Sequence, residues 1–245
     1  VEVDPAVVNL TAFETRSEEK RPFFVEGAGI FSFGQSGGQG GYGRMFGGGH
    51  MGGGSTQLLY SRRIGDSPPG SVPGDPAYED VPDATTILGA TKLTGQTGGG
   101  WALGLMEAVT AEESGRFVDE AGHSGKAEVA PLSNYLVARV RKDFREGQSA
   151  IGIIGTAVNR DLSDENLAGD LRSSAYSGGM DLLHEWGNRT WSLSGQVAGS
   201  RIAGAPEVIA DAQTSSARYF QRPDAHHIEL DPEANSLSGY SGSLE

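Results

Sequence analysis

Alternating hydrophobic and polar residues predict a series of β-strands along this chain. In 176–186, for example, Met180 and Leu182 alternate with Asp181 and Glu185. Successive side chains of a strand point to opposite sides, so this pattern predicts one apolar face and one polar face. Such segments are about nine to eleven residues long, the length that a tilted strand needs to cross a bilayer.

The same reasoning divides most of the chain into strands, turns and loops. The predicted strands are 56–64, 85–94, 101–111, 132–144, 150–160, 174–186, 190–202, 227–230 and 236–244. A short helix leading into a strand is predicted within 1–33, and a helix-like segment at 206–212. Tight turns at 146–147 and 187–188 contrast with long loops at 65–83, 112–130, 161–173 and 203–225. Short turns on one rim and long loops on the other are typical of outer-membrane barrels.

We therefore expect an all-β fold, an antiparallel up-and-down β-barrel of the outer-membrane type that is a partial barrel with long loops on one rim. Aromatic residues near the strand ends fit an interfacial girdle; they are Trp101, Tyr135, Phe144, Trp186 and Trp191. The alternative is a soluble β-sandwich, whose polar face would meet bulk water. In the barrel interpretation, 1–55 form a charged N-terminal segment and a glycine-rich loop that serve as plug or rim. Residues 56–245 form strands that continue beyond the chain end in the parent protein.

Composition narrows the function classes. The chain has 245 residues with a formal net charge of -13, and such an acidic surface repels phosphate backbones, so we expect no nucleic-acid partner. The absence of cysteine excludes disulfides, thiolate metal sites and cysteine nucleophiles. No run of eighteen apolar residues exists, which excludes a transmembrane helix. Twelve of the 38 glycines lie in 34–55, which we interpret as a flexible loop.

Several separated segments resemble one known family. They are VEVDPAVVNLTAFETRSEEKRPFFVEGAGIFSFG at 1–34, LLYSRRIG at 58–65, ILGATKLTG at 87–95, YSGGMDLLHEW at 176–186 and SSARYFQRPDAHHIELDPEANSLSGY at 215–240. In this order they are similar to the family called domain of unknown function 5916. The resemblance implies a region that follows a carbohydrate-binding module of the family 9 type and forms an outer-membrane barrel in Gram-negative bacteria. Its implied partners are outer-membrane lipid, the remainder of the parent barrel and a glycan. The activity of the family is not established, so no catalytic residue is carried over.

Charged residues on the polar faces are the candidates for a lumenal or ligand-binding role. They are Glu26, Arg62, Arg63, Arg139, Arg141, Asp181 and Glu185. Asp181 and Glu185 would lie about 13 Å apart along one strand, which exceeds the carboxylate separations of glycosidases. We therefore expect mutual charge pairing in a lumen, with a structural, transport or glycan-handling function.

Two weaker patterns support the alternatives of a hydrolase or a soluble carbohydrate-binding module. Ser36 lies in a G-x-S-x-G match, the pattern of a serine esterase nucleophile, although glycine follows where a helix is required. A glycan hydrolase that uses carboxylates is the other enzymatic alternative. Asp224, His226 and His227 are weak candidates for metal ligands, and the oxygens of 231–236 are weak candidates for Ca²⁺ without the EF-hand spacing. We expect no cofactor.

Overall fold

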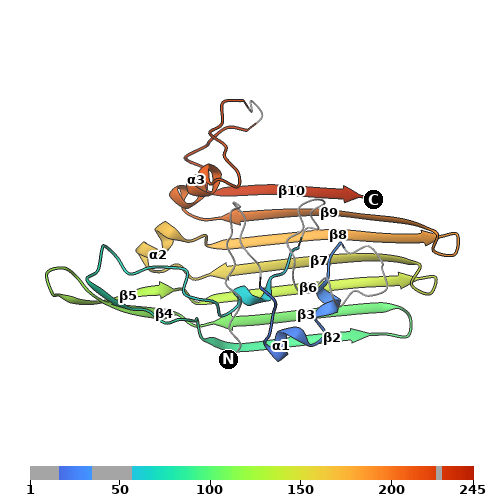
Figure 1. The fold of residues 1–245 in the computed structure, drawn as a ribbon, viewed down its shortest axis with the longest axis horizontal. Coiled ribbons are helices and arrows are strands. Elements are labelled where there is room, and N and C mark those ends of the chain that lie inside the picture. Colours follow the sequence, from blue (N-terminus) through green and yellow to red (C-terminus); the bar gives the residue numbers. More distant parts are fainter. Residues whose placement is uncertain (1–16, 35–56, 225–227) are drawn as a thin grey trace.

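The computed structural model describes residues 17–34, 57–224 and 228–245, and these residues form a mostly β structure. Its main layer is a seven-stranded antiparallel sheet in the order β10-β9-β8-β7-β6-β3-β2 (Figure 1). The strands are β2 (Ile87–Gln96), β3 (Trp101–Thr110), β6 (Ser133–Phe144), β7 (Ser149–Arg160), β8 (Ser174–Trp186), β9 (Trp191–Ala203) and β10 (Ser236–Leu244). A second, three-stranded sheet has the order β1-β4-β5, with β1 (Tyr78–Asp80), β4 (Glu113–Val118) and β5 (Ser124–Ala130).

The large sheet is an up-and-down meander with two different rims. Short turns join β2 to β3, β6 to β7 and β8 to β9 on the right of Figure 1, whereas the long connections lie on the left. The β6–β7 turn has three consecutive residues of positive φ: Arg145, Glu146 and Gly147. This left-handed backbone reverses the chain tightly and matches the right-handed twist of the flanking strands. The predicted division into a short-turn rim and a long-loop rim is confirmed.

Short helices lie on one side of the sheet and at the long-loop rim. They are α1 (Pro22–Val25), the 3-10 turns Ala28–Phe31 and Ser61–Arg63, α2 (Glu165–Asp170) and α3 (Pro206–Thr214). The Asp164 carboxylate accepts hydrogen bonds from the first backbone amides of α2 and so caps it. Pro206 begins α3, where its missing amide hydrogen costs nothing.

The hydrophobic core lies between the N-terminal segment 17–34 and one face of the large sheet, here called the covered face. Phe24, Phe31 and Phe33 pack there against small and medium side chains of the strands, such as Met106 and Val137. Aromatic groups bury much apolar area each, so three phenylalanines anchor an otherwise short segment. In Figure 1 the segment crosses the sheet from β2 and β3 towards β8.

Most of the predicted strands and the helix near 206–212 are confirmed, and six segments differ. Residues 57–64 contain the 3-10 turn Ser61–Arg63 and no strand, and 228–230 are not a strand. The loop predicted at 112–130 contains the β4–β5 hairpin, and the loop at 65–83 contains β1. The loop at 161–173 contains α2, while the described part of 1–33 has helical turns but no strand. The hairpin was missed because Gly115 and Gly125 break its apolar alternation.

The described strands do not close into a barrel. The two edges of the large sheet, β2 and β10, each pair with a single neighbour within the described residues. The all-β antiparallel prediction is confirmed at this level, and the two sheets are also consistent with a sandwich-like β fold.

Candidate functional site

A buried ion pair lies at the centre of the covered face. Arg139 on β6 donates two hydrogen bonds to the Asp181 carboxylate on β8, and the Nη2–Oδ2 distance is 2.9 Å. The Arg139 side chain is 0% exposed and that of Asp181 is 12% exposed. The guanidinium is planar and matches a carboxylate with two parallel hydrogen bonds, the strongest geometry for such a pair. Two of the lumenal candidates are therefore paired with each other.

A glycine of the intervening strand makes this cross-strand pair sterically feasible. Arg139 and Asp181 both pair with β7, at Ile154 and at Gly152. A Cβ atom at Gly152 would lie 2.4 Å from Nη2 of Arg139, so the guanidinium occupies the space that any other side chain would fill. The absence of a side chain at Gly152 therefore lets β6 and β8 interact across β7.

The N-terminal segment is seated over this pair and on a second glycine. The Phe33 ring lies 5.9 Å from the Arg139 guanidinium carbon, within the range of a cation–π contact. A Cβ atom at Gly179 on β8 would lie 2.4 Å from the same ring. Gly34 adopts a φ of +67° and lies directly against the buried amide of Gln196. The segment therefore occupies a path along the covered face that glycines keep free of side chains.

A polar clamp ties the start of this segment to residues 57–64. The Arg21 guanidinium donates to both carboxylate oxygens of Glu19, at 2.8 and 2.7 Å, and to the backbone carbonyl of Ser61 at 2.9 Å. The Ser61 hydroxyl donates to Glu19 at 2.7 Å. Burial raises the pKa of Glu19, but hydrogen bonds from Arg21 and Ser61 outweigh it and lower that pKa to about 2. Glu19 is therefore ionised at neutral pH.

Replacing Gly179 with alanine is expected to loosen the seated segment. The new Cβ atom would overlap the Phe33 ring, and overpacking of this kind destabilises a fold by about 1–3 kcal/mol. Unfolding by urea would measure the loss, and trypsin cleavage after Lys20 would report release of the segment. Gly155→Ala on β7 is the control, because nothing lies within 4 Å of its Cβ position, and it should change stability by less than about 0.5 kcal/mol. Equal protection of Lys20 in both variants would contradict this placement.

The opposite face of the large sheet, here called the outer face, is apolar and exposed. Along β3, Leu103 and Leu105 point to this face and are each 46% exposed, while Ala102 and Ala108 point to the covered face and are buried. The cross-strand register aligns the exposed positions into a continuous belt. The belt consists of Leu93, Leu103, Leu105, Leu136, Val140, Ile151, Ile153, Met180, Leu182 and Val197, with the half-buried Leu193 on the same face. Large apolar side chains thus face outward, whereas the charged pair faces inward.

Different side chains border the two ends of the belt. At the short-turn rim, Trp186 pairs with Trp191 across β8 and β9, and the Lys142 ammonium lies 5.2 Å from the Trp101 ring. At the long-loop rim the outer face becomes polar, where the Tyr176 hydroxyl donates to Asn159 at 2.6 Å. The apolar belt is therefore bounded by aromatic and polar groups along the strand direction.

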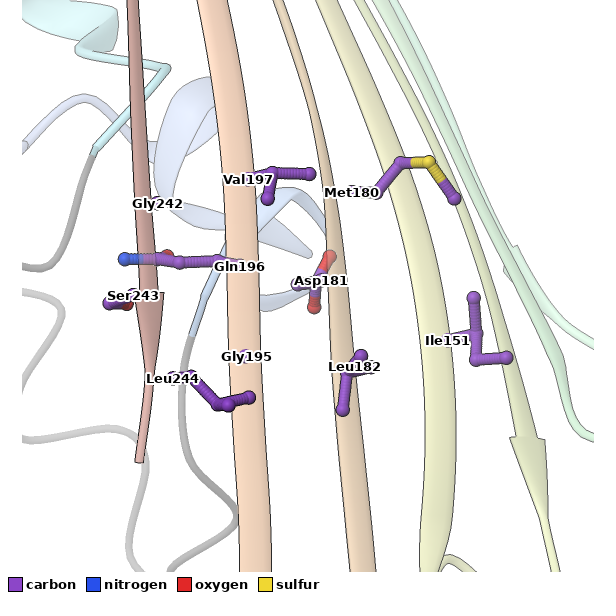
Figure 2. Close-up of a pocket in the computed structure, with 10 residues that line it drawn as sticks. All are labelled: Ile151, Met180, Asp181, Leu182, Gly195, Gln196, Val197, Gly242, Ser243 and Leu244. Atoms are coloured by element: carbon purple, nitrogen blue, oxygen red, sulfur yellow. The ribbon is translucent and has the colours of Figure 1, made fainter.

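A shallow groove of about 570 Å³ crosses the outer face near the β10 edge. It exists because Gly195 and Gly242 carry no side chains among larger apolar neighbours; these neighbours are Ile151, Met180, Leu182, Val197 and Leu244. Figure 2 shows the side chains of Val197 and Leu244 on one side of the sheet and those of Gln196 and Ser243 on the other. The groove has the apolar character of the belt and belongs to the same surface.

The remaining lumenal candidates are not gathered around the central pair. Arg141 forms its own ion pair with Asp143 at 2.9 Å, and Glu185 lies 3.4 Å from Arg189 in the next turn. Glu26, Arg62 and Arg63 lie outside the large sheet, on the N-terminal segment and a 3-10 turn. The prediction that strand alternation directs these three inward is wrong, because none of them belongs to a strand.

The weak catalytic and metal candidates either lie outside the described residues or make ordinary surface contacts. Ser36, His226 and His227 lie outside the described residues. Asp224 is exposed and lies 3.7 Å from Arg222. The carboxylate of Asp231 accepts a hydrogen bond from the backbone of Glu233. Within the described ranges, no group of three or more histidine and acidic side chains is arranged to hold a metal ion.

Sequence reasoning missed the glycines and the amide that shape the covered face. Gly152 and Gly179 occupy inward positions of the neighbouring strands β7 and β8, and their role depends on which side chain packs against each of them. Gln196 is buried, and its Oε1 atom has no hydrogen-bond partner within the described residues. Inward glycines on neighbouring strands are a sequence signal for close packing of another segment, and this signal was available.

These features define the class as a mostly β protein with antiparallel sheets, a covered face that carries the hydrophobic core and a buried ion pair, and an exposed apolar face. No helix among the described residues is long and apolar enough to cross a membrane. The chain belongs to the family described as domain of unknown function (DUF5916), whose model matches residues 1–36 and 54–224. Comparison with curated proteins and with solved structures finds no match.

Proposed function

We propose that this chain forms a section of the wall of an outer-membrane β-barrel, with the outer face against lipid and the segment 17–34 inside. The observation that carries the proposal is that large apolar side chains are exposed on one face of the large sheet, while a charged pair is buried on the other face. Ile153 and Met180 are directly cross-strand and at least half exposed, while the Arg139–Asp181 pair is buried on the other face. Soluble proteins rarely expose contiguous apolar surface of this extent, whereas lipid favours it.

The height of the belt supports the same function. Tyr176 and Trp186 border the belt on β8 and are ten residues apart, which is about 33 Å along a strand. At a strand tilt of about 40°, this corresponds to about 25 Å along the membrane normal, the height of the apolar band of outer-membrane barrels. Aromatic rings at one border fit the interface between headgroups and acyl chains.

The covered face supports a plugged interior rather than an open channel. The segment 17–34 occupies part of this face, and its aromatic side chains fill the space that the glycines leave. The proposed role is therefore structural or in transport, with this segment as an internal plug. A glycan ligand remains an expectation from the family resemblance, and no site on the described surface is assigned to it.

Tryptophan fluorescence in lipid vesicles tests the proposal, because all three tryptophans of the chain lie on the short-turn rim. In phosphatidylcholine vesicles with brominated acyl chains, we expect strong quenching, greatest for bromines near the headgroups. Acrylamide in the aqueous phase should quench weakly. A chain that is monomeric and folded without detergent, with no quenching by brominated lipid, would instead support the soluble sandwich.

A further inference from the structure

A second cavity, of about 370 Å³, lies at the long-loop rim between α2 and α3. Its positive lining comes from Arg160 at the end of β7, Arg172 before β8 and Arg218 after α3. Three segments distant in sequence therefore bring three guanidinium groups to one hollow. This concentration is unexpected in a chain with a formal net charge of -13.

These guanidinium groups are not neutralised by carboxylates of the described part of the chain. Arg160 donates to the backbone carbonyl of Arg172 at 3.0 Å, which holds the two residues together. The Nε atom of Arg172 is buried and has no hydrogen-bond partner among the described residues. No ion pair within 4.0 Å joins any of the three arginines to a described acidic residue, although Asp170 and Asp211 also line the cavity.

The pKa of Arg172 agrees with a cluster of positive charges that has no carboxylate partner among the described residues. Burial lowers the pKa of Arg172, and repulsion from Arg218, Arg160 and Arg63 lowers it further. Like charges that converge on a partly buried hollow are unfavourable unless an anion completes the arrangement. A bound oxyanion would accept the unused donors and offset the mutual repulsion of the arginines.

We propose that this cavity binds a small organic phosphate, with the phosphoryl group held by Arg172 and Arg218. Guanidinium forks match phosphate oxygens in geometry and charge. The volume exceeds that of a phosphate ion alone and falls in the range of small-molecule pockets. Pro69, Leu171, Val208 and Ala212 provide an apolar wall for the organic part. The site is independent of the membrane placement proposed above.

Calorimetric titration of the full chain in detergent with inorganic phosphate tests the site at low ionic strength. Arg218→Gln and Arg172→Gln should each weaken phosphate binding by about tenfold, the effect of losing one charge-assisted contact. Arg218 is exposed, so its variant should fold normally even if Arg172→Gln does not. Arg116→Gln, which removes an exposed charge from β4, is the matched control and should change affinity by less than about twofold.

A gain of affinity provides the complementary test. Asp211 lines the cavity and is exposed, so Asp211→Asn should tighten phosphate binding by about threefold by removing a repulsive charge. Titration with dihexanoyl phosphatidic acid distinguishes two sources of the phosphoryl group. If the site takes a lipid headgroup, this lipid should bind more tightly than inorganic phosphate. If the site takes a free phosphate compound, the lipid and inorganic phosphate should bind equally. No phosphate binding by the unchanged chain, tighter binding of acetate than of phosphate, or unchanged affinity of both arginine variants would overturn the proposal.

Discussion

Ile153→Arg is expected to weaken folding of the chain into a lipid bilayer by about 2–4 kcal/mol, because an arginine at the middle of a lipid-facing strand is exposed to hydrocarbon. Ile153 is 54% exposed and lies near the centre of the apolar belt, opposite Met180 on β8. With about 1.4 kcal/mol for each factor of ten, the folding equilibrium should fall by a factor of about 30 to 700. Urea titration of the chain in phosphatidylcholine vesicles measures this change.

The same substitution made nearer to the membrane interface provides the control. Ser238→Arg places the same side chain on the outer face of β10, at the polar end near the long-loop rim. Close to the interface the cost of an arginine should fall to about 0–1 kcal/mol. A surface facing water would give less than about 0.5 kcal/mol at both positions. Equal, small effects of the two substitutions would therefore contradict a lipid-facing surface.

Asp181→Asn is expected to destabilise the fold by about 3–5 kcal/mol, because it leaves the fully buried Arg139 guanidinium without its counter-charge. The amide keeps the size of the carboxylate, so the loss reports charge rather than packing. Adding Arg139→Met should recover much of the stability, since the double variant has no buried charge. Chemical denaturation of the four proteins of this cycle gives the coupling free energy.

A second ion pair on the same face provides the matched control for this cycle. Arg141 and Asp143 are 2.9 Å apart on β6, but their side chains are 32% and 37% exposed. Solvent screens such a pair, so Asp143→Asn should cost only about 0–1 kcal/mol. If the Asp181 and Asp143 variants lose the same small amount of stability, the covered face is open to water and the central pair is not buried.

The two experiments together separate the interpretations of the large sheet. In a sandwich, a second layer covers the apolar face, and polar groups meet water. In the proposed barrel, the apolar face meets lipid, and polar groups are enclosed with partners because unpaired charges are costly away from water. A strong effect at both Ile153 and Asp181 is expected only for the barrel.

Strand positions were predictable where side-chain size and polarity alternate without interruption. The segments that became β6, β7, β8 and β9 alternate over their length, and their turns contain residues that tolerate positive φ, such as Gly147 and Asn188. The β4–β5 hairpin and α2 were hidden because each is short and its apolar contacts, such as Leu167 near Val129, come from distant parts of the chain. Short elements gain their stability from tertiary packing, which local sequence does not report.

The central ion pair was only half predictable. Alternation placed Arg139 and Asp181 on the polar face of their strands, but it could not pair them, since they are 42 residues apart. Their meeting depends on the register of β6 and β8 against β7 and on the glycine between them. A shift of one residue in either pairing would place one of the two charges on the outer face.

The amino-acid sequence by itself determined the antiparallel strands, their two unlike faces, the short-turn rim and the long-loop rim, because these follow from local alternation and turn residues. Only the tertiary structure decided that the N-terminal segment packs over the face that carries the hydrophobic core, that Arg139 meets Asp181, and that three distant arginines converge at α2 and α3. These contacts join residues far apart in the chain, so they depend on strand register and side-chain volume in three dimensions rather than on any local pattern.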